Sequence, residues 1–152
     1  MHHIILKAVY LIAFINILYL LVLPVIHRSK GLPNPLLQTF VIPISSSHGA
    51  AMSFTVSHIE ILLQRNIPAG NIALVAMGQG IYLLEECNSQ YHLRVQALLE
   101  EGVQVYACES SMQRLTTNLA AGRFQLMAGV KMTADGKQLV DSLMNAGFVS
   151  AI

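Results

Sequence analysis

The chain has little charge, few cysteines and no Trp, and two of these scarcities exclude whole classes of protein. Charged residues make up 11% of its 152 residues and hydrophobic residues 54%, which excludes a disordered chain, since disorder needs the opposite balance. The formal net charge of +1 excludes a nucleic-acid binder that relies on a basic patch. Two cysteines are too few for a disulfide-stapled scaffold. What is abundant is apolar sequence, with a mean hydropathy of +0.55.

Much of this apolar excess lies in the first 26 residues. Residues 8–26 form a run of 19 without a charged side chain, about the length that crosses the hydrocarbon core of a bilayer. The run is long for the core of a signal peptide, and no small-x-small cleavage site follows it. We therefore predict a transmembrane helix in residues 1–26 that anchors the protein to a membrane. A cleaved signal-like segment, or a translation start further downstream, is the alternative.

The side of the membrane on which the rest of the chain lies, periplasmic or cytoplasmic, is not determined by the sequence. Lys7 precedes the apolar run, whereas Arg28 and Lys30 follow it, so the positive charges that set orientation are nearly balanced. Residues 27–37 contain Gly and two Pro without an apolar period, and they are predicted to be a linker. Residues 38–152 are predicted to be one domain. Six basic and eight acidic residues make this part mildly acidic, which gives no electrostatic case for nucleic acid.

Strand-like and helix-like patterns alternate through this domain. Apolar runs predict strands at residues 40–44, 72–77, 103–107, 128–132 and 148–152. Apolar residues at helical spacing predict helices between them, at residues 52–63, 81–86, 91–98, 112–119 and 139–144. Pro43 cannot donate to a strand ladder, so a bulge or a strand end is expected there. The alternation predicts a three-layer α/β/α fold with a mainly parallel five-stranded sheet, preceded by the transmembrane helix.

Ligands bind at the carboxyl ends of the strands in such sheets, and among the loops at this edge only Cys108 is a good nucleophile. It lies between a predicted strand and a predicted helix, where the N–H groups at the helix start favour a thiolate. Ser110 and Gln113 have the spacing of a capping box that would start the helix just past Cys108. The Glu109 carboxylate opposes ionisation of the thiol. The alternative is a buried Cys108 that only packs at the strand end.

The sequence around Cys108 resembles the cysteine-bearing strand-to-helix turn of the DsrE/DsrF-like family. The resemblance starts from residues 102–112 (GVQVYACESSM). Residues 72–80 (IALVAMGQG), with Gly78 and Gly80, are similar to the family's second strand and glycine turn. Residues 128–132 and 146–149 fit the end of the family's chain. The resemblance covers residues 38–152 and implies a small α/β protein that forms homo-oligomers.

The same resemblance implies a function. Sulfur-relay members of the family carry sulfur as a persulfide on the cysteine of this turn, and Cys108 is the matching position. The resemblance therefore implies a persulfide carrier or thiol-redox protein whose partners are sulfur donor and acceptor proteins or small thiols. The alternative is a non-catalytic, homo-oligomeric binding module in which Cys108 is structural.

Weaker signals surround this prediction. His48 follows the first strand and is either a proton shuttle or a turn-capping or solvated side chain. Cys87 is either a resolving thiol for Cys108 or an inert, buried or half-buried one. Residues 45–49 could cradle a phosphate, which leaves flavin or nucleotide binding as a third hypothesis. However, Gly78-x-Gly80 lacks the third glycine of a dinucleotide fingerprint, and Cys87 and His92 are poorly spaced for a metal. We predict no cofactor and no metal.

Overall fold

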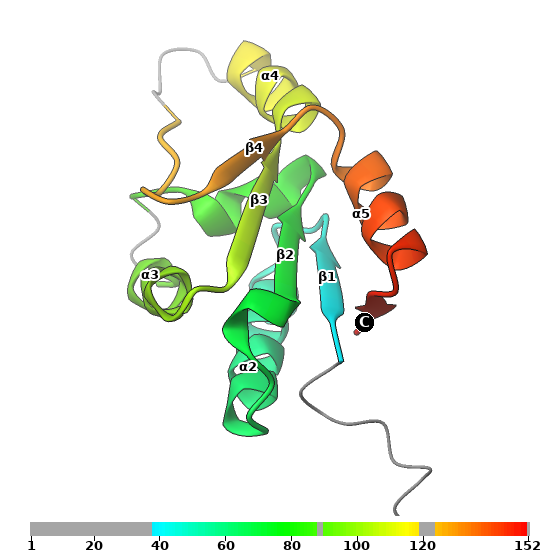
Figure 1. Cartoon of the computed structure of the whole chain (residues 1–152). Coiled ribbons are helices and arrows are strands. Elements are labelled where there is room, and N and C mark those ends of the chain that lie inside the picture. Colours follow the sequence, from blue (N-terminus) through cyan, green and yellow to red (C-terminus); the bar gives the residue numbers. More distant parts are fainter. Residues whose placement is uncertain (1–37, 88–89, 119–123, 152) are drawn as a thin grey trace, which may run out of the picture. The chain divides into compact units, whose positions relative to one another are not determined.

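A five-stranded parallel sheet forms the centre of the molecule (Figure 1). The computed structural model describes residues 38–87, 90–118 and 124–151, which fall within the compact unit Asn34–Ile152. All strand pairs are parallel, in the order β4-β3-β2-β1-β5. The strands are β1 (Phe40–Ile44), β2 (Ile72–Ala76), β3 (Gln104–Cys108), β4 (Lys131–Thr133) and β5 (Val149–Ser150). The predicted parallel five-stranded sheet is thereby confirmed.

Helices connect successive strands. In chain order they are α2 (Gly49–Gln64), the 3₁₀ helices η2 (Ala69–Asn71) and η3 (Gly78–Leu84), α3 (His92–Glu101), α4 (Glu109–Asn118) and α5 (Gly136–Asn145). Gly102 ends α3 with φ 98°, a left-handed conformation that glycine adopts at little cost.

The order of the strands decides which face each helix covers. The three connections β1 to β2, β2 to β3 and β3 to β4 each move one strand along the sheet in the same direction. Right-handed crossovers therefore place the helices of these connections on one face of the sheet. The connection from β4 to β5 runs back across the sheet, so α5 lies on the opposite face. The side-chain clusters agree, because α2, α3, η3 and α4 pack in the main core, whereas α5 packs on Val41 and Val75 in a second cluster. The molecule therefore has three layers, and one of the outer layers is a single helix.

Strand β2 is the most deeply buried element. All five of its residues are buried, as expected for a central strand covered on both faces. Leu74 faces the main core and Val75 the cluster under α5. Full burial of each such side chain contributes on the order of 1.5–3 kcal/mol.

Strand β1 passes through Pro43 without a bulge, and the alternative expected there, a strand end, comes one residue later at Ile44. Ile44 O accepts a hydrogen bond from Met77 N of the β2 side, and Val41 O accepts one from Ala151 N of the β5 side. Since strand residues alternate in the side to which they bond, Pro43 faces the β5 side. Strand β5 pairs only with Phe40 and Val41. The missing N–H of Pro43 therefore costs the sheet no ladder bond.

Three predicted elements differ from those observed. The helix predicted at residues 81–86 is the 3₁₀ helix η3, which begins at Gly78. The strand predicted at residues 128–132 is shifted to Lys131–Thr133, because Leu126 and Met127 instead pair with Glu85 and Leu84 beside η3. The last strand is only Val149–Ser150. The structure does not describe Leu119, the predicted linker or residues 1–26. Among the residues that it does describe, no helix is long and apolar enough to cross a membrane.

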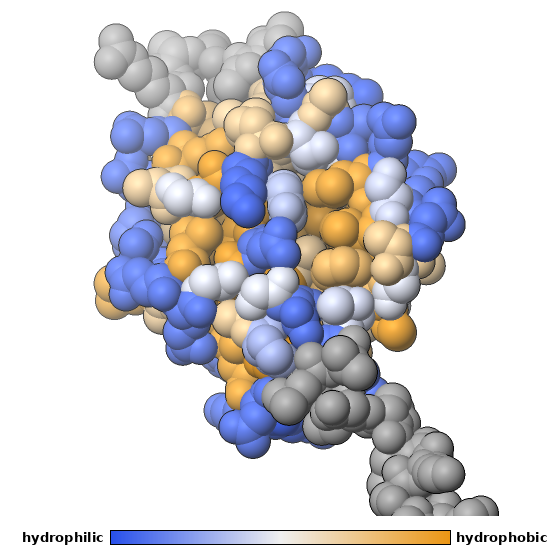
Figure 2. Space-filling model, viewed as in Figure 1, coloured by the Kyte–Doolittle hydropathy of each residue, from blue (hydrophilic) through white to orange (hydrophobic). Residues whose placement is uncertain are grey.

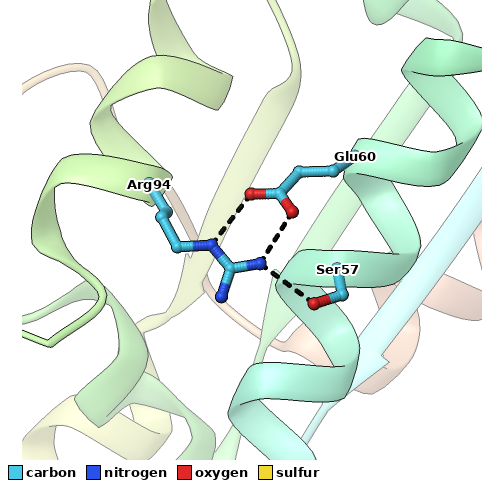
Figure 3. A network of polar contacts seen from close by, with 3 residues as sticks. All are labelled: Ser57, Glu60 and Arg94. Atoms are coloured by element: carbon cyan, nitrogen blue, oxygen red, sulfur yellow. Dashed lines mark hydrogen bonds and ion pairs between the residues drawn. The ribbon is translucent and has the colours of Figure 1, made fainter.

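A polar network joins α2 to α3 on the surface (Figure 3). Arg94 Nε and Nη2 donate to the two carboxylate oxygens of Glu60 at 2.9 and 2.7 Å, and Nη2 also donates to Ser57 Oγ. Hydrogen bonding to the Glu60 carboxylate is the main reason why the pKa of Arg94 is raised. Both side chains of the ion pair are more than one-third exposed, so its contribution to stability is at most about 1 kcal/mol. The network connects α2 to α3 and is assigned a structural role.

The surface is not uniformly polar. In the view of Figure 2, two apolar areas are separated by a strip of polar side chains. Large apolar side chains are also exposed on individual helices, with Leu93 of α3 at 79% and Phe54 of α2 at 57%.

The core predicts a clear contrast between two leucines. Leu74→Ala should lower the free energy of unfolding by about 2–5 kcal/mol, because it leaves a cavity in a fully buried strand. The same change at exposed Leu93 should alter it by less than about 0.5 kcal/mol. Urea unfolding of the two variants beside wild type measures both values. Equal effects would contradict the burial assigned to β2.

Candidate functional site

Cys108 lies at the carboxyl ends of two neighbouring strands, and the helices that follow these strands lie on opposite faces of the sheet. It is the last residue of β3 and pairs with Thr133 at the end of β4. The chain leaves β3 into α4 on the main-core face and leaves β4 into α5 on the other face. Crevices at the carboxyl ends of such diverging strands are the usual ligand sites of open α/β sheets. The topology therefore places the thiol between the starts of two helices.

The start of α4 supplies one group of hydrogen bonds to the sulfur. Helix α4 begins at Glu109, so Cys108 directly precedes the first helical residue, in the position of an N-cap. Ser110 Oγ lies 3.2 Å from Cys108 Sγ. The hydroxyl and the backbone N–H of Ser111 also hydrogen-bond to the sulfur. The Ser111 hydroxyl in turn accepts a hydrogen bond from Gly78 N at 2.9 Å, which ties the loop after β2 to the site.

The start of α5 supplies a further donor from the other face. Asp135 caps this helix, and its Oδ1 accepts hydrogen bonds from the N–H groups of Lys137 and Gln138. The preceding N–H, that of Gly136, donates to Cys108 Sγ at 3.3 Å. The partially positive ends of two helices thus meet at one sulfur atom.

These contacts favour the thiolate. Burial, with the residue only 3% exposed, is the largest single influence on the Cys108 pKa and raises it. The hydrogen bonds from Ser110, Ser111 and Gly136 together outweigh burial and lower the pKa of Cys108 from 9.0 to about 7. A thiol with this pKa is substantially ionised at neutral pH and is a competent nucleophile.

The residues predicted as auxiliaries have different placements. Ser110 lies against the sulfur, but as the second residue of α4 and not as its cap, because the helix starts one residue earlier than the predicted capping box. Glu109 is exposed at the first position of α4 and is not among the groups that shift the Cys108 pKa, contrary to the opposing effect expected. Gly78 reaches the site only through its N–H to Ser111.

Gly80 and His48 are not brought to the sulfur. Gly80 is buried where η3 crosses the end of β1, and a Cβ there would lie 2.3 Å from Ile44 O, so its glycine is required for packing. His48 has an exposed side chain that does not cap α2, and its backbone N–H donates to Ser46 Oγ. It follows β1, which is separated from β3 by β2, about 9–10 Å away at the usual strand spacing. The residues that hydrogen-bond to Cys108 come from α4 and α5.

Cys87 is an exposed free thiol and forms no disulfide with Cys108. The buried or half-buried Cys87 expected from the sequence is therefore wrong. In the described part of the chain, no three His, Cys, Asp or Glu side chains are placed to hold a metal ion.

Sequence reasoning missed Ser111, Asp135 and Gly136. Asp135 carried a signal, since an Asp directly before an amphipathic helix is a common N-cap. Nothing in the sequence indicated that the loop after β4 lies beside Cys108, because this depends on β3 and β4 being neighbours.

Fold and site together define a small parallel α/β protein with an activated thiol at a strand-to-helix turn. No protein-family model and no curated protein sequence matches the chain. Solved structures do match its fold. One is a protein of unknown function, MTH1491 from Methanobacterium thermoautotrophicum, with a TM-score of 0.64 and 20% identity over 74% of this chain and 96% of that one.

Two further structures are similar. The ychN protein from E. coli has a TM-score of 0.56 and 12% identity over 75% of this chain and 97% of its own. BT1422 from Bacteroides thetaiotaomicron, a conserved protein of unknown function, has a TM-score of 0.52 and 15% identity over 78% and 99%. The chain described here shares the fold of these three structures.

The lowered pKa of Cys108 predicts a pH-dependent contribution to stability. Because the pKa is about 7 in the folded protein and near 9.0 in the unfolded chain, the thiolate stabilises the fold at high pH and this contribution is lost as the pH falls through about 7. The free energy of unfolding of wild type minus that of Cys108→Ser should therefore increase by about 2 kcal/mol between about pH 6 and about pH 9. Denaturant titrations across this range measure it. A difference independent of pH would show that the thiol does not ionise there in the folded state.

Proposed function

We propose that the chain is a member of the DsrE/DsrF-like family and that Cys108 carries sulfur as a persulfide. The observation that supports this most is a single sulfur atom that receives hydrogen bonds from the starts of two helices on opposite faces of the sheet. The DsrE-like fold supports the family. The resemblance of the Cys108 turn supports the chemistry.

The proposed reaction needs only thiol exchange. The Cys108 thiolate attacks the terminal sulfur of a donor R–S–SH, so that a new S–S bond forms, the donor's S–S bond breaks, and R–S⁻ leaves. An acceptor thiolate R′–S⁻ then attacks the outer sulfur of Cys108–S–SH, forming R′–S–SH and regenerating the Cys108 thiolate. Neither step changes the overall redox balance or requires a cofactor. The burial of Cys108 shelters the thiolate and the persulfide from bulk oxidants.

The two cysteines provide a matched test of this proposal. Wild type treated with inorganic polysulfide and examined by intact mass should gain the mass of one sulfur atom, removable by a small thiol. Cys87→Ser should gain the same mass as wild type, whereas Cys108→Ser should gain none. Loading of wild type that is absent, or equal loading in Cys108→Ser, would rule out carriage at Cys108.

A non-catalytic binding module is the second candidate, and exposed apolar side chains favour it. Leu93 and Phe54 lie on α3 and α2 with more than half of their surfaces in solvent. Such side chains in a self-associating surface would be covered in a homo-oligomer.

This second candidate has a separate readout. Leu93→Glu together with Phe54→Glu should reduce the mass of the assembly in analytical ultracentrifugation, while Cys108→Ser leaves it unchanged. The matched control is Gln96→Glu, which adds the same charge to the same helix, α3, as Leu93→Glu. A mass unaffected by the apolar substitutions would remove α2 and α3 as the self-associating surface.

A further inference from the structure

Gly136 occupies a position beside Cys108 that has no room for a side chain. It is buried at the first position of α5. A Cβ at this residue would lie 2.4 Å from Met77 Cγ, 2.9 Å from Met77 Sδ and 3.1 Å from Cys108 Cβ. Non-bonded carbon atoms approach no closer than about 3.5 Å without cost. A methyl group here would therefore push the start of α5 away from β3 or displace Met77.

The backbone hydrogen bonds at the start of α5 explain why this close approach matters. The Asp135 side chain accepts hydrogen bonds from the N–H groups of Lys137 and Gln138. The first backbone hydrogen bond of the helix runs from Leu139 N to Asp135 O. The remaining first-turn N–H, that of Gly136, donates to Cys108 Sγ. An N–H left without a partner in a buried place is unfavourable, so the sulfur and the helix start stabilise each other.

We propose that Gly136 is a positioning residue for Cys108, because the lack of a side chain lets the first N–H of α5 reach the sulfur and hold it where it reacts. The inference rests on the proposed function and extends it to a residue that carries no chemistry of its own. When an acceptor removes the outer sulfur, the leaving group is the Cys108 thiolate, and a better-stabilised thiolate leaves faster. Gly136 thus acts on both the loading and the release of sulfur.

Gly136→Ala is the first test, made on the full chain. In a Cys87→Ser background, which removes the exposed second thiol, the midpoint of the pH profile for alkylation by iodoacetamide should rise by about one unit, with about tenfold less thiolate well below the midpoint. Transfer of sulfur from the loaded protein to a small thiol should slow several-fold. Gly70→Ala is the matched control, since nothing lies within 4 Å of a Cβ there, and its profile should equal that of wild type. A folded Gly136→Ala protein with an unchanged midpoint would overturn the inference.

A second variant keeps the test decisive if Gly136→Ala does not fold. Met77→Ala together with Gly136→Ala removes the two closest contacts of the added methyl group. This protein should fold and should regain most of the wild-type midpoint, measured against Met77→Ala alone. A double variant that remains unfolded, or one whose midpoint lies about one unit above that of Met77→Ala alone, contradicts the steric origin.

The alkylation profile also separates this inference from the proposed function. It measures the unloaded thiol and needs no sulfur donor. A wild type that takes up no sulfur but shows the predicted shift in Gly136→Ala would refute carriage and retain the positioning role. A wild type that loads normally, together with an unchanged alkylation midpoint in Gly136→Ala, would retain carriage and refute the positioning role.

Discussion

The sulfur of Cys108 and the hydrogen bonds that converge on it are the constraint on which the functional part of this molecule depends. A buried thiolate is unfavourable unless donors replace the water that it has lost. Here the donors come from the first turns of α4 and α5, which approach from opposite faces of the sheet. Each helix start has N–H groups that lack partners within its own helix, and the sulfur supplies one. The arrangement therefore satisfies the needs of the thiol and of both helices at once.

Close backbone packing makes this convergence possible. At the carboxyl edge of the sheet, Gly80 lets η3 pass directly over the end of β1, and Gly136 lets α5 begin against β3. Between them, Gly78 binds Ser111 and so connects the loop after β2 to the first turn of α4. The buried strand β2 holds these elements in register from both faces. A side chain at Gly80 would push η3 away from β1, and one at Gly136 would push α5 away from β3, whereas the site requires these elements to be in contact.

The fold and the chemistry support the proposed function by different routes. The structural neighbours share the fold at 12–20% identity, and two of them are described as proteins of unknown function. Because one fold hosts many activities, the chemistry has to be inferred from the site. The site offers a sheltered nucleophile of lowered pKa without a general base beside it among its described hydrogen-bond partners. Thiol exchange needs no more than this, whereas acid–base catalysis would require a further titratable group.

The local pattern of the sequence determined the succession of strands and helices along the chain, the parallel sheet and the placement of Cys108 at a strand-to-helix turn. Alternation of apolar runs with helical spacing is a short-range property, so these features could be predicted from residues 38–152 alone. The membrane helix in residues 1–26 stays a prediction of the same kind. Why Pro43 costs no ladder bond could not be predicted, because the short length of β5 is a property of the sheet and not of β1.

The tertiary structure decided which loops meet. Asp135 and Gly136 are 27 and 28 positions from Cys108, and only the pairing of β3 with β4 brings them to the sulfur. The placement of β2 between β1 and β3 leaves His48 two strands away from Cys108. Residues on one sheet edge look equivalent in the sequence, but the order of strands and the face taken by each helix select which of them touch. The sequence by itself placed Cys108 at a strand-to-helix turn, and the topology of the sheet decided which residues surround it.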